Sequence, residues 1–136
     1  VAKFIAQAEL RGFEVGLALD VNTPVGEIEE YIWNIDGLLL LSVNAGKSGQ
    51  EFNDSVLKKI KEVEKLRDDI PVVVDGGLSE NEIKECLTAR WAEELEEGTD
   101  VHPGFTEMEF AVGSHLWNSE DLKEELNNLQ TLKTHE

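Results

Sequence analysis

The feature that most constrains the fold is the stretch from Ile70 to Gly77, Ile-Pro-Val-Val-Val-Asp-Gly-Gly. Its three consecutive valines, residues 72–74, predict a short strand buried on both faces, as in a parallel sheet flanked by helices. Ser79 and Glu82 follow with the spacing of a capping box, which predicts the start of a helix. The stretch therefore indicates a strand, a tight turn and a helix.

The predicted strand ends in a carboxylate, Asp75, followed by Gly76 and Gly77. Ligands of α/β proteins bind at the carboxyl ends of parallel strands, so Asp75 is a candidate catalytic group or metal ligand. Its position alone equally allows that it only caps the turn. The glycines let backbone N–H groups approach an anion such as phosphate at the start of the next helix.

Helices and strands alternate along the rest of the chain. Apolar spacings of three and four predict helices at residues 2–11, 23–35, 53–68, 79–97 and 119–132. Apolar runs predict strands at residues 15–19, 38–43, 72–74 and 108–112, and a polar loop at 44–50. We expect Thr23 to cap the second helix, Pro24 to begin it, and the lysines of the third helix to face solvent. The alternation predicts one domain with a parallel sheet built from βαβ units.

Composition excludes several classes of partner. The 136 residues include 29 acidic and 12 basic side chains, a formal net charge of −17, which argues against binding to nucleic acid or an anionic membrane. No apolar run is as long as a membrane span. The single cysteine, Cys86, excludes an intrachain disulfide and fits a reducing cytoplasm; a reactive thiol is the less favoured interpretation. The first residue is Val1, which suggests a processed or truncated product.

Four motifs occur in the same order as in a known enzyme family. They are Gly16-Leu-Ala-Leu19 with Thr23-Pro24, Leu38-Leu-Leu-Leu-Ser-Val-Asn44 with Gly46, Gly49 and Gln50, Val74-Asp-Gly-Gly77, and Val112-Gly-Ser114. Each motif alone is weak, but the ordered set is specific. In this respect the chain resembles the later part of ribulose-phosphate 3-epimerase. The resemblance implies an α/β fold that is the C-terminal half of a (β/α)8 TIM barrel, with four parallel strands alternating with helices. It implies one partial domain over residues 1–136 that runs from the fourth helix through the eighth helix and includes strands five to eight.

The resemblance also implies a reaction. The family interconverts ribulose 5-phosphate and xylulose 5-phosphate by proton transfer at C3, with a divalent metal ion (Zn, Fe, Mn or Co) suited to stabilising the enediolate. Asp75 is implied as one acid/base and a metal ligand. The implied phosphate-binding residues are Gly46, Gly49, Gly76, Gly77, Gly113 and Ser114, the first two within the loop that closes over the sugar. The two histidine ligands and the second aspartate of the family would lie in a missing first half, so we expect the isolated chain to be inactive.

Other candidate site residues have simpler interpretations. Lys47 can pair with phosphate, although a solvated loop lysine is favoured. Asp100 and His102 can bind a metal, but two ligands in a loop fall short of a site. His115 is interpreted as a packing or helix-start residue near the phosphate end.

Two functions from different classes follow. In the favoured one, the chain is part of a cytoplasmic epimerase that binds a sugar phosphate; in the other, it is a catalytically silent half-barrel that binds phosphate or assembles with partners. A half-barrel leaves the interior face of its sheet uncovered and exposes two strand edges. Leaving apolar surface in water costs about 25 cal/mol per Å² of free energy. We therefore expect no compact, stable monomer. The open face should pair with a second copy, a complementing N-terminal half-barrel, or the helix at 79–97.

Overall fold

The computed structural model describes residues 1–96 and 108–132, with all of their side chains except those of residues 92–96. Four parallel strands form one sheet in the order β1 (Gly16–Leu19), β2 (Gly37–Leu41), β3 (Val72–Asp75) and β4 (Met108–Ala111). The α-helices are α1 (Ala2–Glu9), α2 (Ser55–Leu66), α3 (Glu80–Glu96), α4 (Ser114–Trp117) and α5 (Leu122–Thr131), and two 3-10 helices, η1 (Val25–Ile28) and η2 (Ile32–Asn34), join β1 to β2. The predicted strands and α/β architecture, half of a TIM barrel, are confirmed.

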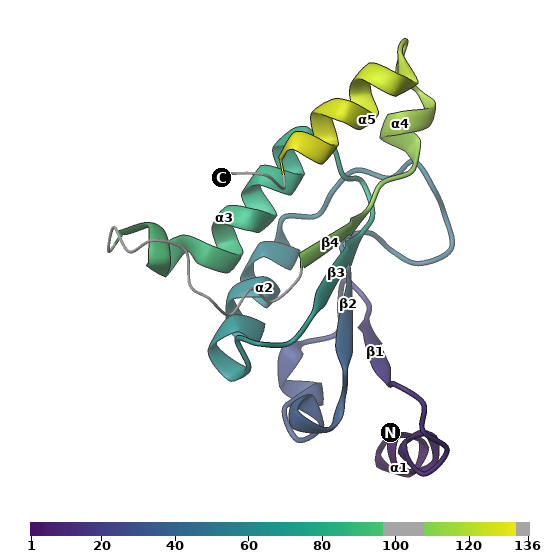
Figure 1. Ribbon diagram of the computed structural model, residues 1–136, viewed down its shortest axis with the longest axis vertical. Coiled ribbons are helices and arrows are strands. Elements are labelled where there is room, and N and C mark those ends of the chain that lie inside the picture. The colour runs from purple at the N-terminus through teal and green to yellow at the C-terminus, as the bar shows by residue number, and fades with distance from the viewer. Residues whose placement is uncertain (97–107, 133–136) are drawn as a thin grey trace.

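The core lies between the sheet and one layer of helices. Helices α2 and α3 lie side by side on this face of the sheet (Figure 1). Two rows of strand residues point toward them, Leu17, Leu38, Val72 and Met108 in one and Leu19, Leu40, Val74 and Phe110 in the other. Val56, Ile60 and Val63 of α2 are completely buried against these rows. The period of two along each strand thus separates a helix-covered face from an opposite face.

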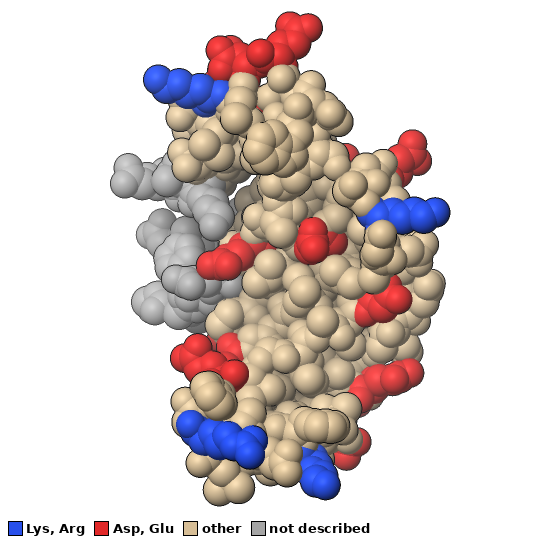
Figure 2. Space-filling model, turned by 90° about the vertical axis from the view of Figure 1, so that its right-hand side faces the viewer, with Lys and Arg blue, Asp and Glu red and all other residues tan. Residues whose placement is uncertain are grey.

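The opposite face of the sheet carries no covering helix among the described residues (Figure 1). Its rows consist of Ala18, Leu39, Val73 and Glu109, and of Leu41, Asp75 and Ala111. Figure 2 shows this open face as a mostly uncharged surface with a few acidic residues. The prediction that residues 72–74 are buried on both faces is wrong for Val73, which is half-buried. The expectation that the helix at 79–97 covers the open face is also wrong, because α3 packs beside α2.

The segment predicted as the second helix contains two 3-10 turns instead. Ile28, Ile32 and Ile35 are buried as expected, with 5%, 1% and 3% of their surface exposed. Pro24 is extended, with φ −70° and ψ 150°, and precedes the first turn of η1, so Thr23 does not cap a helix and Pro24 does not begin one. The segment is rich in β-branched residues, whose restricted χ1 lowers α-helix propensity. The isoleucines can be buried together because residues three or four apart lie on the same side of a 3-10 turn as well as of an α-helix.

The remaining boundaries differ by a few residues. Helix α1 is followed by Gly12 with φ +74°, the left-handed glycine expected after a helix. The last helix begins at Leu122 rather than at residue 119, with Asp121 accepting hydrogen bonds from the backbone N–H groups of Lys123 and Glu124. The short helix α4 was not predicted, because four residues are too few for an apolar period. Helix α3 is kinked at Trp91, where φ is −118° and ψ is 21°.

Two cationic side chains of the helical layer act as internal ties. Lys59 of α2 is only 8% exposed, so the expectation that every lysine of this helix faces solvent is wrong. Its Nζ donates to the Asp20 carbonyl at 2.6 Å, and burial lowers the pKa of its ammonium group. Arg90 of α3 donates to the carbonyls of Asp68 and Ile70 at 2.7 and 3.1 Å. These ties hold the end of β1 and the entry to β3.

Cys86 lies in the core and is completely buried. Burial, followed by the nearby carboxylates of Glu85 and Glu82, raises the pKa of its thiol to about 12. This agrees with the interpretation of Cys86 as unreactive. None of the described helices is long and apolar enough to cross a membrane.

Candidate active site

Asp75 is the last residue of β3 and lies on the open face of the sheet. In register it stands between Leu41 of β2 and Ala111 of β4, and its side chain is half-buried. No group of the described residues gives its carboxylate a hydrogen bond or an ion pair. The alternative that Asp75 only caps a turn is therefore not supported, because a capping carboxylate accepts a hydrogen bond from a nearby N–H group.

The backbone of Asp75 is fixed by Ser42, which follows β2. The Ser42 N–H donates to the Asp75 carbonyl at 2.9 Å. The Ser42 hydroxyl lies 3.0 Å from the same carbonyl and 2.5 Å from the carbonyl of Gly76, and Ser42 is completely buried. The sequence reasoning noted Ser42 only as part of a motif. Its role was hidden because its partners lie more than 30 positions away in the chain.

The two glycines after Asp75 form a turn that no other residue fits; we call residues 75–77 the β3 turn. Gly76 and Gly77 have φ values of +121° and +62°, which L residues rarely adopt. A Cβ on Gly77 would lie 2.5 Å from the backbone nitrogen of Phe52, and one on Gly76 would overlap the side chain of Val43. Both the backbone conformation and the close packing therefore require glycine at these two positions, as the sequence predicted.

The loop at residues 44–50 is closed by its last side chain. Gln50 Nε2 donates to the carbonyls of Asn44 and Lys47, both at 2.7 Å. Gly46 and Gly49 have φ values of +97° and +75° and allow the chain to turn between these contacts. The Gln50 carbonyl lies 2.9 Å from a Cβ built on Gly77, so the base of the loop rests on the β3 turn.

The loop also reaches the end of β4, where residues 112–114 form what we call the β4 turn. A Cβ built on Gly49 would lie 4.0 Å from Ser114 Oγ. The structure thus brings Gly49, Gly77 and Ser114 to one edge of the sheet. Gly46 and Gly113 are different, because a Cβ on either would meet no atom within 4 Å among the described residues.

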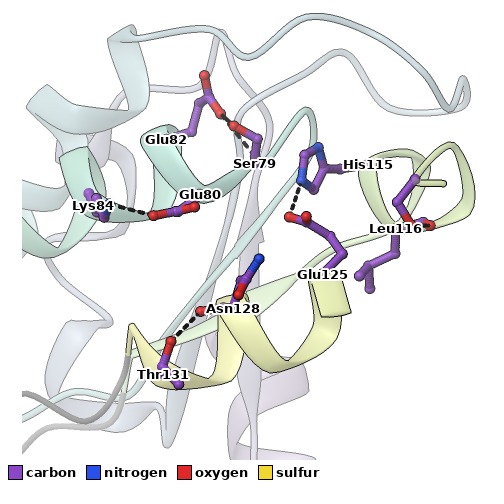
Figure 3. A network of polar contacts seen from close by, with 10 residues as sticks. Ser79, Glu80, Glu82, Lys84, His115, Leu116, Glu125, Asn128 and Thr131 are labelled. Atoms are coloured by element: carbon purple, nitrogen blue, oxygen red, sulfur yellow. Dashed lines mark hydrogen bonds and ion pairs between the residues drawn. The ribbon is translucent and has the colours of Figure 1, made fainter. Parts of the chain in front are cut away.

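A polar pair marks the start of α3, directly after the β3 turn. Glu82 Oε2 accepts hydrogen bonds from the N–H of Ser79, at 2.9 Å, and from its hydroxyl (Figure 3). The Ser79 hydrogen bond is the main reason that the pKa of Glu82 is lowered, and His115 adds a smaller electrostatic contribution. The predicted capping pair is therefore present, with the carboxylate as the acceptor of both bonds.

A second polar pair lies beside the β4 turn. His115 Nε2 is 2.6 Å from Glu125 Oε1, which joins α4 to α5 (Figure 3). The side chains are 36% and 22% exposed. His115 is thus a helix-start residue near the predicted phosphate end, as expected, but no sequence pattern indicated its partner ten positions away.

The described residues do not form a metal site by themselves. No group of three or more His, Cys, Asp or Glu side chains that could hold a metal ion occurs among them. Asp75 offers one carboxylate at the right edge of the sheet. Asp100 and His102, the other candidate ligands, lie outside the described residues.

Comparison of the sequence with known proteins indicates one enzyme family. The family profile described as "Ribulose-phosphate 3 epimerase family" matches residues 1–101. The ribulose-phosphate 3-epimerase of Aquifex aeolicus is 30% identical over 125 residues, covering 89% of this chain and 49% of that protein. The enzyme of the same name from Buchnera aphidicola is 35% identical over 123 residues, covering 88% and 47%.

A shorter match has the higher identity. The Bacillus subtilis ribulose-phosphate 3-epimerase is 42% identical over 74 residues, which cover 51% of this chain and 34% of that protein. The chain spans about half the length or less of these relatives. On the family profile, which covers most of its residues, the chain belongs to the ribulose-phosphate 3-epimerase family.

Proposed function

We propose that this chain supplies one proton-transfer group and the phosphate-binding turns of an enzyme that interconverts ribulose 5-phosphate and xylulose 5-phosphate. Membership of the family supports an epimerase. The observation that carries the proposal is Asp75, a half-buried carboxylate without a partner among the described residues, at the carboxyl end of β3 on the open face. An acid in this position is available to a substrate that lies across the strand ends.

Asp75 suits the reaction because epimerisation needs an acid/base on each side of the reacting carbon. The proton on C3 is acidified by the neighbouring C2 ketone, and a carboxylate within hydrogen-bond reach can remove it or return it. Asp75 would act on the side of C3 that faces the sheet. The group for the other side would come from the other half of the barrel.

The phosphate end of the substrate would lie at the β3 and β4 turns. Gly76, Gly77, Gly113 and Ser114, which lack long side chains, would present backbone N–H groups there. Backbone donors bind a phosphate dianion without a cationic side chain, which matters in a chain with a formal net charge of −17. Gly46 and Gly49 would let the loop at 44–50 close over the sugar.

A divalent metal ion fits this chain only in part, because the resemblance implies only Asp75 as a ligand here, and no group of three or more His, Cys, Asp or Glu side chains that could hold the ion occurs among the described residues. When bound, such an ion would stabilise negative charge on the enediolate oxygens. In the proposal its remaining ligands belong to the other half of the barrel, and the isolated chain is inactive.

The open face is the proposed surface for that other half. We favour an N-terminal half-barrel over a second copy as the occupant, because two copies would bring together chains that each carry a formal charge of −17. A cytoplasmic location would suit a phosphorylated substrate and an unpaired cysteine.

A silent phosphate-binding module is the second candidate function. The observation that favours it is the uneven distribution of site residues. The proposed phosphate turns lie within the described residues of this chain, whereas the resemblance implies only one of the two proton-transfer groups here, Asp75.

The test is epimerisation of ribulose 5-phosphate by the chain combined with an N-terminal half-barrel of the family. We expect Asp75→Asn to lower turnover by about 10²–10⁴-fold, the usual contribution of general acid–base catalysis. Asp54→Asn is the matched control, because Asp54 is the exposed residue directly before α2 and makes no side-chain capping bond. Near-normal turnover after Asp75→Asn would refute the catalytic role, and an inactive wild-type assembly that still binds phosphate would favour the silent module.

A further inference from the structure

One carboxylate stands in an otherwise apolar row of the open face. Glu109 of β4 is in register with Val73, and the same row continues through Leu39 and Ala18. Its neighbours along the strand, Met108 and Phe110, pack into the core on the helical side. Because side chains alternate along a strand, Glu109 points to the open side, where it is exposed. It lies one row before the strand ends that would hold the substrate.

Glu109 has no cationic neighbour on this face. Among the described residues, its carboxylate makes no hydrogen bond or ion pair. Neither row of the open face contains a lysine or arginine, and the basic side chains in Figure 2 lie at the margins of the face. Water solvates the carboxylate while the face is open. The interior of a closed barrel is packed with side chains instead, and a charge buried there requires a partner of opposite charge.

The position of Glu109 on an edge strand adds to this requirement. Strand β4 pairs only with β3 among the described strands, so its other edge is available to a further strand. In a closed (β/α)8 barrel, that further strand is the first strand of the N-terminal half. Inward-pointing charges are one means by which edge strands avoid pairing with wrong partners. Glu109 thus disfavours a strand that offers only apolar side chains at this level.

We propose that Glu109 makes the open face selective for an N-terminal half-barrel that carries a lysine or arginine facing it in the barrel interior. The inference rests on the proposed function, which already requires such a half, and adds the chemistry by which that half is recognised. A second copy of the chain is disfavoured for the same reason, because its own row would add another Glu109 and no cation. An ion pair in this position provides specificity, since leaving either charge buried alone is unfavourable.

The test is a double-mutant cycle on the association of two half-barrels, with Kd measured by calorimetric titration. The probe is the first half of the Aquifex aeolicus ribulose-phosphate 3-epimerase. It is prepared in two forms, with leucine or lysine at the interior position of its first strand that faces Glu109. We expect the wild-type chain to bind the lysine form about tenfold more tightly than the leucine form. Glu109→Leu should reverse this preference, because the lysine would then be buried without a partner.

Two further variants separate charge from shape and from folding. Glu109→Gln keeps the length of the side chain and removes its charge, so it should lose the preference for the lysine form. Glu85→Leu is the matched control, because Glu85 is an exposed glutamate of α3 in the helical layer. It removes the same charge without changing the open face and should keep the wild-type preference. Urea unfolding of each variant alone checks that it folds.

The outcomes distinguish this inference from the proposed function. Failure of both probe forms to bind the wild-type chain would refute the open face as the surface for an N-terminal half. Equal binding of the two forms by wild type, or tighter binding of the leucine form, would overturn the role of Glu109 and leave that surface standing. Loss of the preference in Glu85→Leu would assign the effect to overall charge and would also overturn it. The expected preference without epimerisation of ribulose 5-phosphate would support the role of Glu109 and count against the proposed activity.

Discussion

The two turns that face the proposed phosphate are built in opposite ways. In the β3 turn, Gly76 and Gly77 have positive φ and pack against Val43 and Phe52, and buried Ser42 binds the carbonyls at the turn. In the β4 turn, Gly113 has φ −120°, a Cβ added to it would meet no described atom within 4 Å, and the partly exposed contact between His115 and Glu125 lies beside it. The first turn is fixed by packing within this chain.

The difference follows from the places of the two strands in the sheet. β3 is paired on both sides, by β2 and β4, whereas β4 is paired only with β3 among the described strands. A central strand is paired along both of its edges, and the contacts around its end can impose a strained backbone. An edge strand lacks half of its neighbours, so its turn depends on local polar contacts. The comparison predicts that substitutions in the β3 turn cost stability and those in the β4 turn do not.

The largest expected effect is that of Gly77→Ala. Alanine would have to adopt the backbone φ of +62° found at Gly77, and its methyl group would lie 2.5 Å from the Phe52 nitrogen. Strain and overpacking at about 1–3 kcal/mol each should together lower the free energy of unfolding by about 2–6 kcal/mol. Urea unfolding of both chains at equal protein concentration measures this, and a change below 1 kcal/mol would contradict a rigid β3 turn.

Ser42→Ala should have the next largest effect. It removes the completely buried hydroxyl that lies near the carbonyls of Asp75 and Gly76 and leaves the half-buried Gly76 carbonyl without this donor. We expect a loss of about 1–2 kcal/mol in the free energy of unfolding, the cost of losing a partly buried hydrogen bond. Ser48→Ala, in the exposed loop, is the control. Equal unfolding midpoints for the two variants would argue against a tie from Ser42.

Ser79→Ala should cost about 1 kcal/mol at neutral pH, as for the loss of a helix cap. The Ser79 hydrogen bond lowers the pKa of Glu82 from its ordinary value of 4.5. A lowered carboxylate pKa stabilises the fold above the ordinary value, and this stability is lost as pH falls through the folded-state pKa. The difference between wild type and variant should therefore shrink below pH 4.5. A difference independent of pH from 7 to 3 would disprove the linkage.

The smallest effect is expected for Gly113→Ala. No described atom lies within 4 Å of the added methyl group, and φ is −120°. The free energy of unfolding should change by no more than about 0.5 kcal/mol, as for other unconstrained surface positions. This variant is the counterpart of Gly77→Ala, measured in the same way. A large loss here would mean that the β4 turn is as constrained as the β3 turn.

Local pattern was enough to predict much of this protein. Unbroken apolar runs identified four parallel strands, and the residues at their ends, Asp75 with Gly76 and Gly77, were recognisable because strand ends and glycine turns leave short, contiguous signals. The family resemblance rested on the same short motifs. These features depend on neighbours in the sequence, so the sequence by itself determined them.

Other features depend on residues that meet only in the folded chain. Ser42 and Gly76 are 34 positions apart, Lys59 and Asp20 are 39 apart, and His115 finds Glu125 on another helix. The segment from Val25 to Asn34 takes 3-10 turns although its isoleucines have α-helical spacing. In each case the strand pairing and the packing of helices on one face select among arrangements that local propensity leaves nearly equal in free energy. Only the tertiary structure decided these contacts, and with them how firmly each turn of the site is held.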